Sequence, residues 1–454
     1  MIDILNIKLT GEKTGKINEL HSVNCAPYTK SAVKSDSIST DLVDRILGYA
    51  KSPHSRLHDM CGIFGGCYFV DVPNIFRNFD ADENDENNYD FHYTDECIKC
   101  ILHAGTKIYY RLGITIEWGS KKYTCYPPKD NLKWARICEH IIRHYNEGWA
   151  NGYHFDIEYW EIWNEPENPP MWQGTREEFF ELYKVASRHL KTCFPNLKIG
   201  GYGSCGFYAV FEPERHPFWH GFVEYFEKFL ILCKEENLPL DFYSWHIYTN
   251  KISDVVASAE YVRKKLDEYG FKSTESHLNE WNFGHEGKGF MSLESLNAAA
   301  FCTAFMIKLQ ELGVEMAMYY DLNIDSSYNG FINLRTNEFT PVIHPFAAYG
   351  RLFDLKNELK LEFNKDENSP YILAAGNENE AAVLLTGYNK ENLTLKLDLK
   401  EYKGKKVTLY RLKDEKGFIA LSSFEIIDDI IFNLSDNFIY YIAITDNENS
   451  EILF

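Results

Sequence analysis

Eight short apolar segments alternate with longer amphipathic segments between residues 17 and 355, and this alternation is the strongest constraint on the fold. The segments with strand character are residues 19–24, 55–63, 107–113, 155–163, 197–201, 241–246, 276–280 and 315–320. Helical patterns lie between them, as in residues 175–194, where apolar side chains recur at helical spacing before Pro195. Strands that alternate with helices form parallel sheets. Eight such units in succession predict a (β/α)8 barrel with some enlarged loops.

The periodicity changes after residues 345–349, which we expect to lie in the last barrel helix. Residues 392–399 alternate strictly between apolar and polar side chains, and residues 382–386, 406–411, 417–421, 424–427 and 438–445 continue this pattern. Such alternation is typical of the half-buried strands of an antiparallel β-sandwich. We therefore predict an α/β chain in three parts: residues 1–16 form a strand that pairs with the sandwich, residues 17–355 form the barrel, and residues 356–454 form the sandwich.

Charge and cysteine content limit the partners and the compartment. The net charge of −20 opposes binding to nucleic acid or to an anionic membrane surface. No apolar run approaches the ~20 residues that span a bilayer, and the first residues lack the pattern of a signal peptide. The 11 cysteines follow no disulfide framework, which suits a reducing compartment. We expect a cytoplasmic protein that binds neither nucleic acid nor membranes.

Two of the predicted strands end on a glutamate. Glu165 lies in Trp-Asn-Glu-Pro after the fourth strand, and Glu280 lies in Asn-Glu-Trp after the seventh. Barrel enzymes place their chemistry at the carboxyl ends of the strands, and strands four and seven end on opposite sides of the barrel mouth. Two carboxyl groups that face each other across a cleft are what cleavage of a glycosidic bond requires.

The surroundings of the two acids predict different roles for them. A general acid must hold a proton near neutral pH, and Glu165 lies beside Trp163 with a second carboxylate opposite it. A nucleophile must stay ionised and needs hydrogen-bond donors. Arg56, at the end of the second strand, and Tyr248, just beyond the sixth, are the candidates for that task.

Neither of the two metal-like patterns in the chain predicts a metal site. Cys97 and Cys100 form a single CxxC within a helical segment, without the second pair that zinc sites use. The acidic run at residues 80–88 lacks the glycine of a calcium-binding loop, and Phe91 stands where the bidentate glutamate would be needed. We expect no metal and no organic cofactor.

The motifs at the strand ends together resemble a clan of retaining glycosidases whose two acids lie on barrel strands four and seven. Within that clan the chain is similar to glycoside hydrolase family 39, the β-xylosidases and α-L-iduronidases. The similarity extends through residues 161–201, 238–249 and 330–355, which resemble the family's segments around strands four to six and strand eight. An appended β-sandwich belongs to the same family pattern.

The resemblance implies a role for each matching residue. Glu165 corresponds to the acid/base residue, Glu280 to the nucleophile, and Asn164 to the asparagine that binds the sugar hydroxyl next to the anomeric carbon. The remaining matches are residues of the sugar subsite or the arginine near the nucleophile: His58, His246, Tyr248 and Arg56. The implied reaction is a retaining double displacement without a cofactor.

Two departures from the family pattern leave the sugar open. Tyr320 stands where family xylosidases carry a tryptophan beneath the sugar, and Trp281 stands beside the nucleophile where they carry a tyrosine. Both are candidates for substrate contact, as is His21 in the first strand. His285 and Glu286, in a glycine-rich loop after the seventh strand, are weaker candidates.

The sequence therefore predicts a retaining glycoside hydrolase, in the first instance an exo-acting β-xylosidase on short plant-type oligosaccharides. One alternative keeps the mechanism but changes the sugar, giving an arabinosidase, a galactosidase, an α-L-iduronidase or an endo-glycosidase. A second alternative is a non-catalytic carbohydrate-binding barrel. The sandwich also offers a surface through which copies of the chain can associate into a homo-oligomer.

Overall fold

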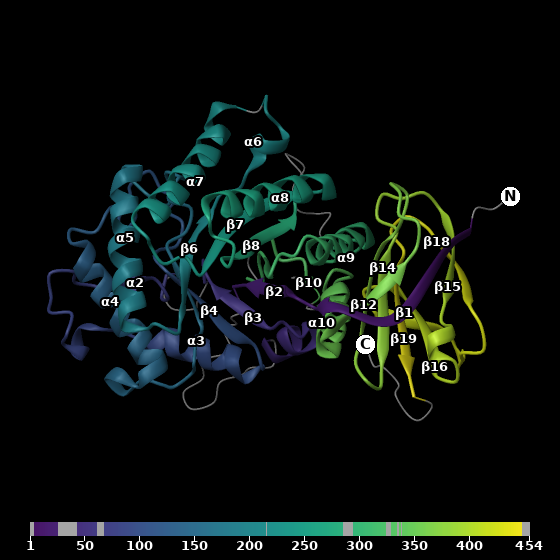
Figure 1. The fold of residues 1–454 in the computed structure, drawn as a ribbon. Helices are drawn as coiled ribbons and strands as arrows, with labels where there is room; N and C mark the ends of the chain where they lie inside the picture. Colours follow the sequence, from purple (N-terminus) through teal and green to yellow (C-terminus); the bar gives the residue numbers. More distant parts are fainter. Residues whose placement is uncertain are drawn as a thin grey trace.

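The computed structural model describes residues 4–25, 43–60, 68–214, 216–284, 294–323, 328–333, 336 and 338–446. Eight parallel strands close into a barrel in chain order, with helices around it (Figure 1). The strands are β2 (Glu19–Asn24), β3 (His54–Leu57), β4 (Lys107–Leu112), β5 (Tyr159–Ile162), β6 (Lys198–Ser204), β7 (Phe242–Thr249), β8 (Glu275–Phe283) and β9 (Met316–Tyr319). The predicted (β/α)8 barrel is confirmed, and each strand overlaps one predicted segment.

The helices between the strands begin and end at residues suited to those positions. They are α2 (Val72–Ile75), α3 (His92–His103), α4 (Asn131–Glu147), α5 (Arg176–Cys193), α6 (Tyr208–Phe211), α7 (Pro217–Glu235), α8 (Ile252–Tyr269), α9 (Leu296–Glu311) and α10 (Ile343–Leu355). Asp130 caps the first turn of α4, and Gly148 ends that helix at φ +77°. Thr175 and Glu178 form a capping box at the start of α5. Among the described helices, none has both the length and the apolar composition needed to cross a bilayer.

The carboxyl-terminal strands and the first strand of the chain form one nine-stranded sheet in the order β17-β16-β19-β14-β13-β12-β1-β15-β18. Their bounds are β1 (Ile4–Lys16), β12 (Asn357–Glu362), β13 (Tyr371–Gly376), β14 (Ala381–Thr386), β15 (Leu393–Asp398), β16 (Lys406–Asp414), β17 (Gly417–Glu425), β18 (Ile430–Leu434) and β19 (Ile439–Thr445). Strand β1 pairs antiparallel with β12 and parallel with β15. A short two-stranded sheet, β10 (Ile332–Asn333) with β11 (Glu338–Phe339), completes the described strands.

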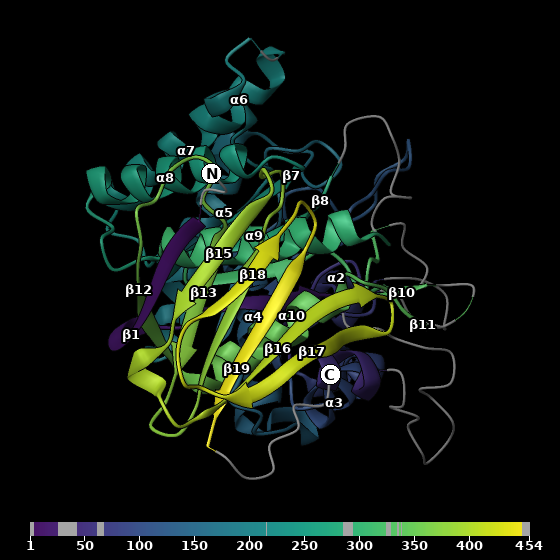
Figure 2. The same cartoon turned by 90° about the vertical axis from the view of Figure 1, so that its right-hand side faces the viewer.

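The nine-stranded sheet curls over its own hydrophobic core (Figure 2). Leu395 and Ile430, from one end of the strand order, belong to the same buried cluster as Val407 and Ile442, from the other end. The expected β-sandwich is thus present, but as one continuous curled sheet. Three of its strands, β12, β13 and β18, were not predicted, and the two segments predicted at residues 417–421 and 424–427 are the single strand β17.

The barrel and the curled sheet share a packed boundary. The hydrophobic cluster of the barrel continues into the sheet through residues such as Tyr410, Phe418 and Tyr441. Hydrogen bonds also cross the boundary: the Tyr388 hydroxyl donates to the Asn250 carbonyl at 2.7 Å. Because apolar side chains of both parts are buried together, the sheet supports α9 and α10 on the outside of the barrel.

Candidate active site

The loop after β5 holds Glu165 in an unusual backbone conformation. Strand β5 ends at Ile162 because Trp163 has φ +71°, and Glu165 itself has φ +44°. A non-glycine residue in this left-handed region is strained and needs support from its surroundings. The support comes from β6, where the carbonyl oxygens of Tyr202 and Gly203 accept from the Glu165 amide at 3.1 and 3.0 Å. The side chain of Glu165 is therefore placed by the turn and not by strand alternation.

A β-bulge in β8 positions Glu280. Trp245 of β7 is opposite Leu278, whereas the next residue of β7, His246, is opposite Glu280, so Asn279 is the extra residue. A bulge re-aims side chains and occurs often beside active sites. Here it turns both Asn279 and Glu280 toward the barrel interior, where each contacts a charged side chain.

Arg56, at the end of β3, connects the two halves of the site. Its guanidinium donates from Nε to Glu161 Oε2 at 2.7 Å, from Nη1 to Glu280 Oε1 at 2.8 Å and to Asn24 Oδ1 at 3.2 Å, and from Nη2 to Asn164 Oδ1 at 2.6 Å. The side chain is fully buried. A buried guanidinium is tolerated only when its donors are satisfied by charged and polar acceptors. The four acceptors of Arg56 meet this condition.

Glu161 is a buried anchor beneath the site. Besides its ion pair with Arg56, it accepts from the Ser244 hydroxyl and from the Asn279 amide, each at 2.6 Å. Its exposure is 0%, so it has no room for a substrate. These contacts give Glu161 a structural role, since they hold Arg56, Ser244 and Asn279 in place.

His246 lies between the two candidate catalytic acids. Its Nδ1 is 2.8 Å from Glu165 Oε1 and 3.4 Å from Glu280 Oε2. One ligand-type atom from each of the three side chains lies within 4.8 Å of the other two. The Tyr248 hydroxyl donates to Glu280 Oε2 at 2.8 Å, and the Asn168 amide donates to Glu165 Oε2 at 2.9 Å.

The surroundings shift the pKa values of Glu280, Glu165 and His246 in different directions. Burial raises the pKa of Glu280 and the nearby charge of Glu165 adds to this, and together they outweigh the opposing effects of His246 and Arg56. Burial also raises the pKa of Glu165, but the hydrogen bond and charge of His246 and the Asn168 amide hold it below its usual value. Burial lowers the pKa of His246, but the two carboxylates raise it overall.

This order differs from the sequence-based expectation that Glu165 itself holds the proton in the resting protein. The difference arises because His246 Nδ1 lies 2.8 Å from Glu165 Oε1, a contact that the sequence did not reveal. The raised pKa of His246 and the lowered pKa of Glu165 favour the proton on the histidine, at a contact of 2.8 Å with the Glu165 carboxylate.

His58 and Tyr320 line the same mouth from β3 and the end of β9. His58 Nδ1 accepts from Arg111 Nε at 3.2 Å, and its Nε2 lies 3.4 Å from Glu280 Oε1. Burial and the neighbouring Arg56 and Arg111 place the pKa of His58 well below its usual value, so the ring is neutral. The Tyr320 hydroxyl donates to Asp59 Oδ2 at 2.9 Å.

Two sequence candidates do not reach the site. Trp281 faces outward from β8, is fully buried, and stacks on Phe305 at 4.1 Å between ring centroids. His21 faces outward from β2, and its Nε2 lies 3.0 Å from the Lys51 carbonyl oxygen. The structure brings neither residue to the site, because neighbouring strand positions alternate between the barrel interior and the helix layer. His285 and Glu286 lie outside the described residues.

The site also contains residues that sequence reasoning missed. Asp59 joins His58 to Tyr320, and Tyr328 lies 5.3 Å from the Tyr320 ring. Glu167 lies two positions after Glu165, accepts from the Ser204 hydroxyl at 2.7 Å, and has its other oxygen buried without a hydrogen-bond partner among the described residues. The second glutamate of the motif Asn-Glu-Pro-Glu was the sequence signal that could have pointed to Glu167.

The Glu165–His246–Glu280 group is one of two in the described residues whose atoms are close enough to hold a metal ion. Here the guanidinium of Arg56 lies on Glu280 at 2.8 Å, and it supplies positive charge where an ion would. The chemistry of this donor set is that of paired carboxylates with a proton between them.

The chain matches the model of a known protein family and shares sequence with known proteins. The model of glycosyl hydrolases family 39 matches residues 44–312. A β-xylosidase of Geobacillus stearothermophilus is 25% identical over 256 residues, which cover 50% of this chain and 47% of that protein. A β-xylosidase of Caldicellulosiruptor saccharolyticus is 24% identical over 361 residues, which cover 72% of this chain and 68% of that protein. The chain thus spans about half the length of the first of these relatives.

Solved structures share the fold over nearly the whole chain. A glucosidase from Croceicoccus marinus has a TM-score of 0.76 at 22% identity, with 98% of this chain and 99% of that chain covered. A monomeric β-xylosidase from Caulobacter crescentus CB15 has a TM-score of 0.70 at 15% identity, with 98% and 100% covered. The similarity extends through the barrel and the curled sheet together.

Proposed function

Because this chain belongs to family 39 of the glycosyl hydrolases, we propose that it is a retaining glycoside hydrolase with Glu280 as nucleophile and Glu165 as acid/base residue. The observation that carries the proposal is the short separation of the two acids, whose nearest oxygens lie within 4.8 Å of each other. Retaining enzymes hold their carboxyl groups about 5–5.5 Å apart, whereas inverting enzymes leave about 6.5–9.5 Å for a water molecule.

In the first step Glu280 attacks the anomeric carbon while Glu165 protonates the leaving oxygen. Arg56 and Tyr248 hold the Glu280 carboxylate in place with hydrogen bonds of 2.8 Å each. The proton for the leaving group comes across the 2.8 Å bond from His246 Nδ1 to Glu165. The products of this step are a glycosyl ester on Glu280 and the released aglycone alcohol.

In the second step water replaces Glu280 at the anomeric carbon. Once Glu280 is esterified, its negative charge is gone, and with it the repulsion that opposes ionisation of Glu165. Glu165 is then able to take a proton from the attacking water. The sugar leaves with its original anomeric configuration, and Glu280 is a carboxylate again.

The substrate we propose is a β-xyloside at the end of a short oligosaccharide, because both curated relatives compared above are named β-xylosidases. Asn164 and His58 supply polar atoms for sugar hydroxyls, and Tyr320 an aromatic face for the ring. A uronic acid would need an unpaired cation near its carboxylate. Arg56 and Arg111 are instead bound to carboxylates at 2.7–2.8 Å, which disfavours an α-L-iduronidase.

A panel of nitrophenyl glycosides tests the reaction and the sugar together. We expect the highest kcat/KM on the β-D-xylopyranoside, with lower values on the β-D-glucopyranoside, β-D-galactopyranoside and α-L-arabinofuranoside. Proton NMR of the first product should show the β anomer before mutarotation. Release of the α anomer would exclude double displacement, and binding of xylose without any hydrolysis would support a non-catalytic barrel.

We also propose that the protein acts in the cytoplasm and forms a homo-oligomer. Buried thiols at Cys97, Cys138 and Cys302 support a reducing compartment. Exposed apolar side chains on the curled sheet, including Phe424 and Ile427, support association. Cell fractionation and light scattering after size-exclusion chromatography would check these two points, and a monomer at micromolar concentration would exclude the second.

A further inference from the structure

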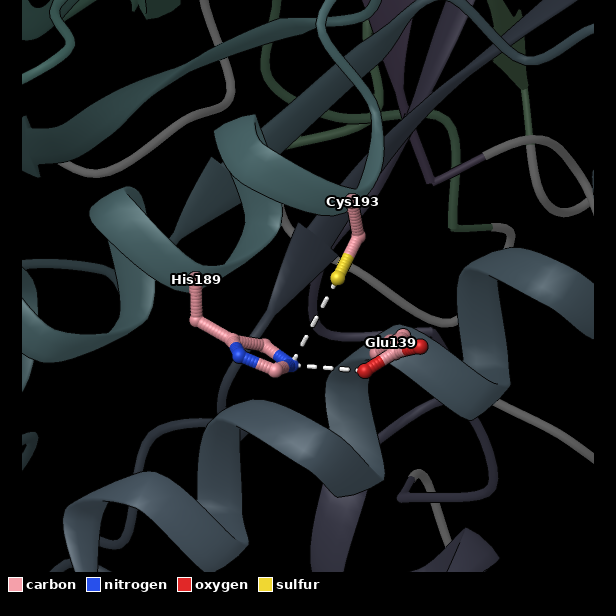
Figure 3. A group of neighbouring side chains, drawn as sticks. All are labelled: Glu139, His189 and Cys193. Atoms are coloured by element: carbon pink, nitrogen blue, oxygen red, sulfur yellow. Dashed lines mark hydrogen bonds and ion pairs between the residues drawn. The ribbon is translucent and has the colours of Figure 1, made fainter.

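A second group of metal-type side chains lies outside the barrel, between helices α4 and α5. His189 and Cys193 are four residues apart on α5 and therefore share one face of the helix. Glu139 projects toward them from α4 (Figure 3). One ligand atom of each lies within 4.8 Å of the other two. The group is independent of the paired acids at the barrel mouth.

We propose that Glu139, His189 and Cys193 bind a divalent transition metal ion of the zinc class. Thiolate, imidazole and carboxylate are the three side-chain ligands that zinc uses, and a thiolate selects against magnesium and calcium. Metal–ligand lengths of about 2.0–2.3 Å place tetrahedral nitrogen and sulfur ligands roughly 3.6 Å apart. Cys193 Sγ and His189 Nε2 are already 3.8 Å apart.

The Glu139–His189 contact must open to admit the ion. Glu139 Oε2 lies 2.6 Å from His189 Nε2, whereas two ligands on one tetrahedral ion lie about 3.3 Å apart. In the absence of an ion these two atoms share a proton. Binding would release that proton together with the thiol proton of Cys193, as is usual for such ligands, and a small rotation of either side chain supplies the remaining distance.

Arg143 holds the carboxylate in the orientation that binding needs. Its Nε donates to Glu139 Oε1 at 2.8 Å, and Nη2 lies 2.8 Å from the same oxygen. This leaves Oε2 directed toward His189. Partners that fix a ligand from behind are a regular part of metal sites. The guanidinium charge opposes the ion, but the carboxylate and the thiolate together bring two negative charges.

The surroundings offer the ion a route and a fourth position. The side chains of His189 and Glu139 are 21% and 15% exposed, so the group is shielded but not closed. Cys193 also lines a surface pocket of about 470 Å³, together with Glu147, Asp156 and Glu158. Three carboxylates around one small pocket raise the local concentration of cations, and water from the pocket can occupy the open coordination position.

The ion would act on stability and not on the reaction. Helix α4 precedes strand β5 and helix α5 follows the loop that carries Glu165. An ion bound by both helices would hold them together on the outside of the barrel. Because a ligand of the folded state raises its stability with concentration, the melting temperature should rise by about 3 °C at a hundredfold excess over Kd.

Cobalt and zinc titrations of the full chain, after treatment with a chelator, test the proposal. We expect one equivalent of Co²⁺ to bind, with a thiolate-to-cobalt charge-transfer band in the near ultraviolet that Zn²⁺ abolishes. The band should be lost in Cys193→Ser and in His189→Asn, and kept in the matched control Cys100→Ser. Having two separate ligand variants keeps the test valid if one of them fails to fold.

The same titration of Glu280→Gln separates this group from the paired acids. A band that persists in Glu280→Gln and is lost in Cys193→Ser supports the proposal. A band that persists in Cys193→Ser, a band lost only in Glu280→Gln, or a wild-type chain that binds no Co²⁺ and whose melting temperature Zn²⁺ does not raise would each overturn it.

Discussion

Strand β8 carries two glutamates, each beside a histidine, and their acidities are shifted in opposite directions. Glu275 lies at the floor of the barrel, where it accepts from Lys198 at 3.1 Å and from the Tyr159 hydroxyl at 3.2 Å, and lies 3.1 Å from His277 Nε2. Burial raises its pKa, but His277 and Lys198 outweigh this and lower the pKa to about 2. Glu280, at the mouth, has a raised pKa.

The different partners of Glu275 and Glu280 show why one buried carboxylate is structural while the other is suited to catalysis. Glu275 meets only donors, so its charge is satisfied and it has no reason to exchange protons. Glu280 also meets donors, but it lies close to a second carboxylate, Glu165. The charge of Glu165 adds to the raised pKa of Glu280, and His246, which lies between the two acids, is the source of the proton that a reaction can use.

Replacing each glutamate in turn by glutamine tests the difference between their roles most directly. We expect Glu280→Gln to lower kcat on an aryl β-xyloside by about 10⁴-fold or more, because the nucleophile is lost. Glu275→Gln should keep kcat within about threefold, since the floor does not contact the substrate. Steady-state rates of both variants measure this, and equal losses in the two would contradict the assignment of roles.

The hydroxyl groups that donate to the two glutamates offer a second, smaller contrast. Tyr248→Phe removes the 2.8 Å bond to Glu280 and should lower kcat by about 10²–10³-fold, the usual cost of one preorganised donor at a reacting group. Tyr159→Phe removes the corresponding bond to Glu275. Its kcat should stay within about twofold, and a loss of tenfold or more there would show that the floor is coupled to the reaction.

Replacing Glu167 tests whether a buried carboxylate near the barrel mouth lowers the free energy of unfolding. Burial raises its pKa to about 7, above the unfolded value of 4.5. Its contribution to stability is therefore complete below about pH 4.5 and is lost as the pH rises through 7. The wild type should lose about 2–3 kcal/mol relative to Glu167→Gln over this range. Urea unfolding of both proteins at pH 5 and pH 8.5 measures this, and a pH-independent difference would exclude it.

The smallest effect concerns the stability that Glu275 provides. Because its folded pKa is depressed, the contribution is present above pH 4.5 and is lost as the pH falls toward 2. The side chain is partly exposed, so we expect Glu275→Gln to cost only about 1 kcal/mol of unfolding free energy at pH 7. The cost should shrink at pH 4 in urea titrations, and growth of the cost there would reverse the assigned sign.

The sequence was sufficient for the barrel and for the acids because both leave local signals. Each barrel strand is a short apolar run, and Glu165 interrupts such a run with a charge that a core position would not tolerate. Trp281 was assigned to the site because it follows Glu280 in the sequence, but neighbouring strand positions face opposite sides of the sheet.

The contacts that set the proton positions left no such signal. The bond between His246 and Glu165 joins residues of strand β7 and the loop after β5, and Arg56 reaches four acceptors on four other segments. These are long-range pairings, so no window of sequence contains both partners. Strand β13 was missed for a different reason, since it is buried on both faces and lacks the alternation of an exposed strand.

Strand β1 has a consequence for the order of events during synthesis. Ile4 pairs with Thr394, and Lys16 pairs with Asn357, so strand β1 must wait until these much later residues have been synthesised before it finds its partners. Meanwhile the barrel can close with a bare hydrogen-bonding strand attached to it. An unpaired strand of this kind invites intermolecular pairing, so the growing chain is most exposed to aggregation before β12 and β15 emerge.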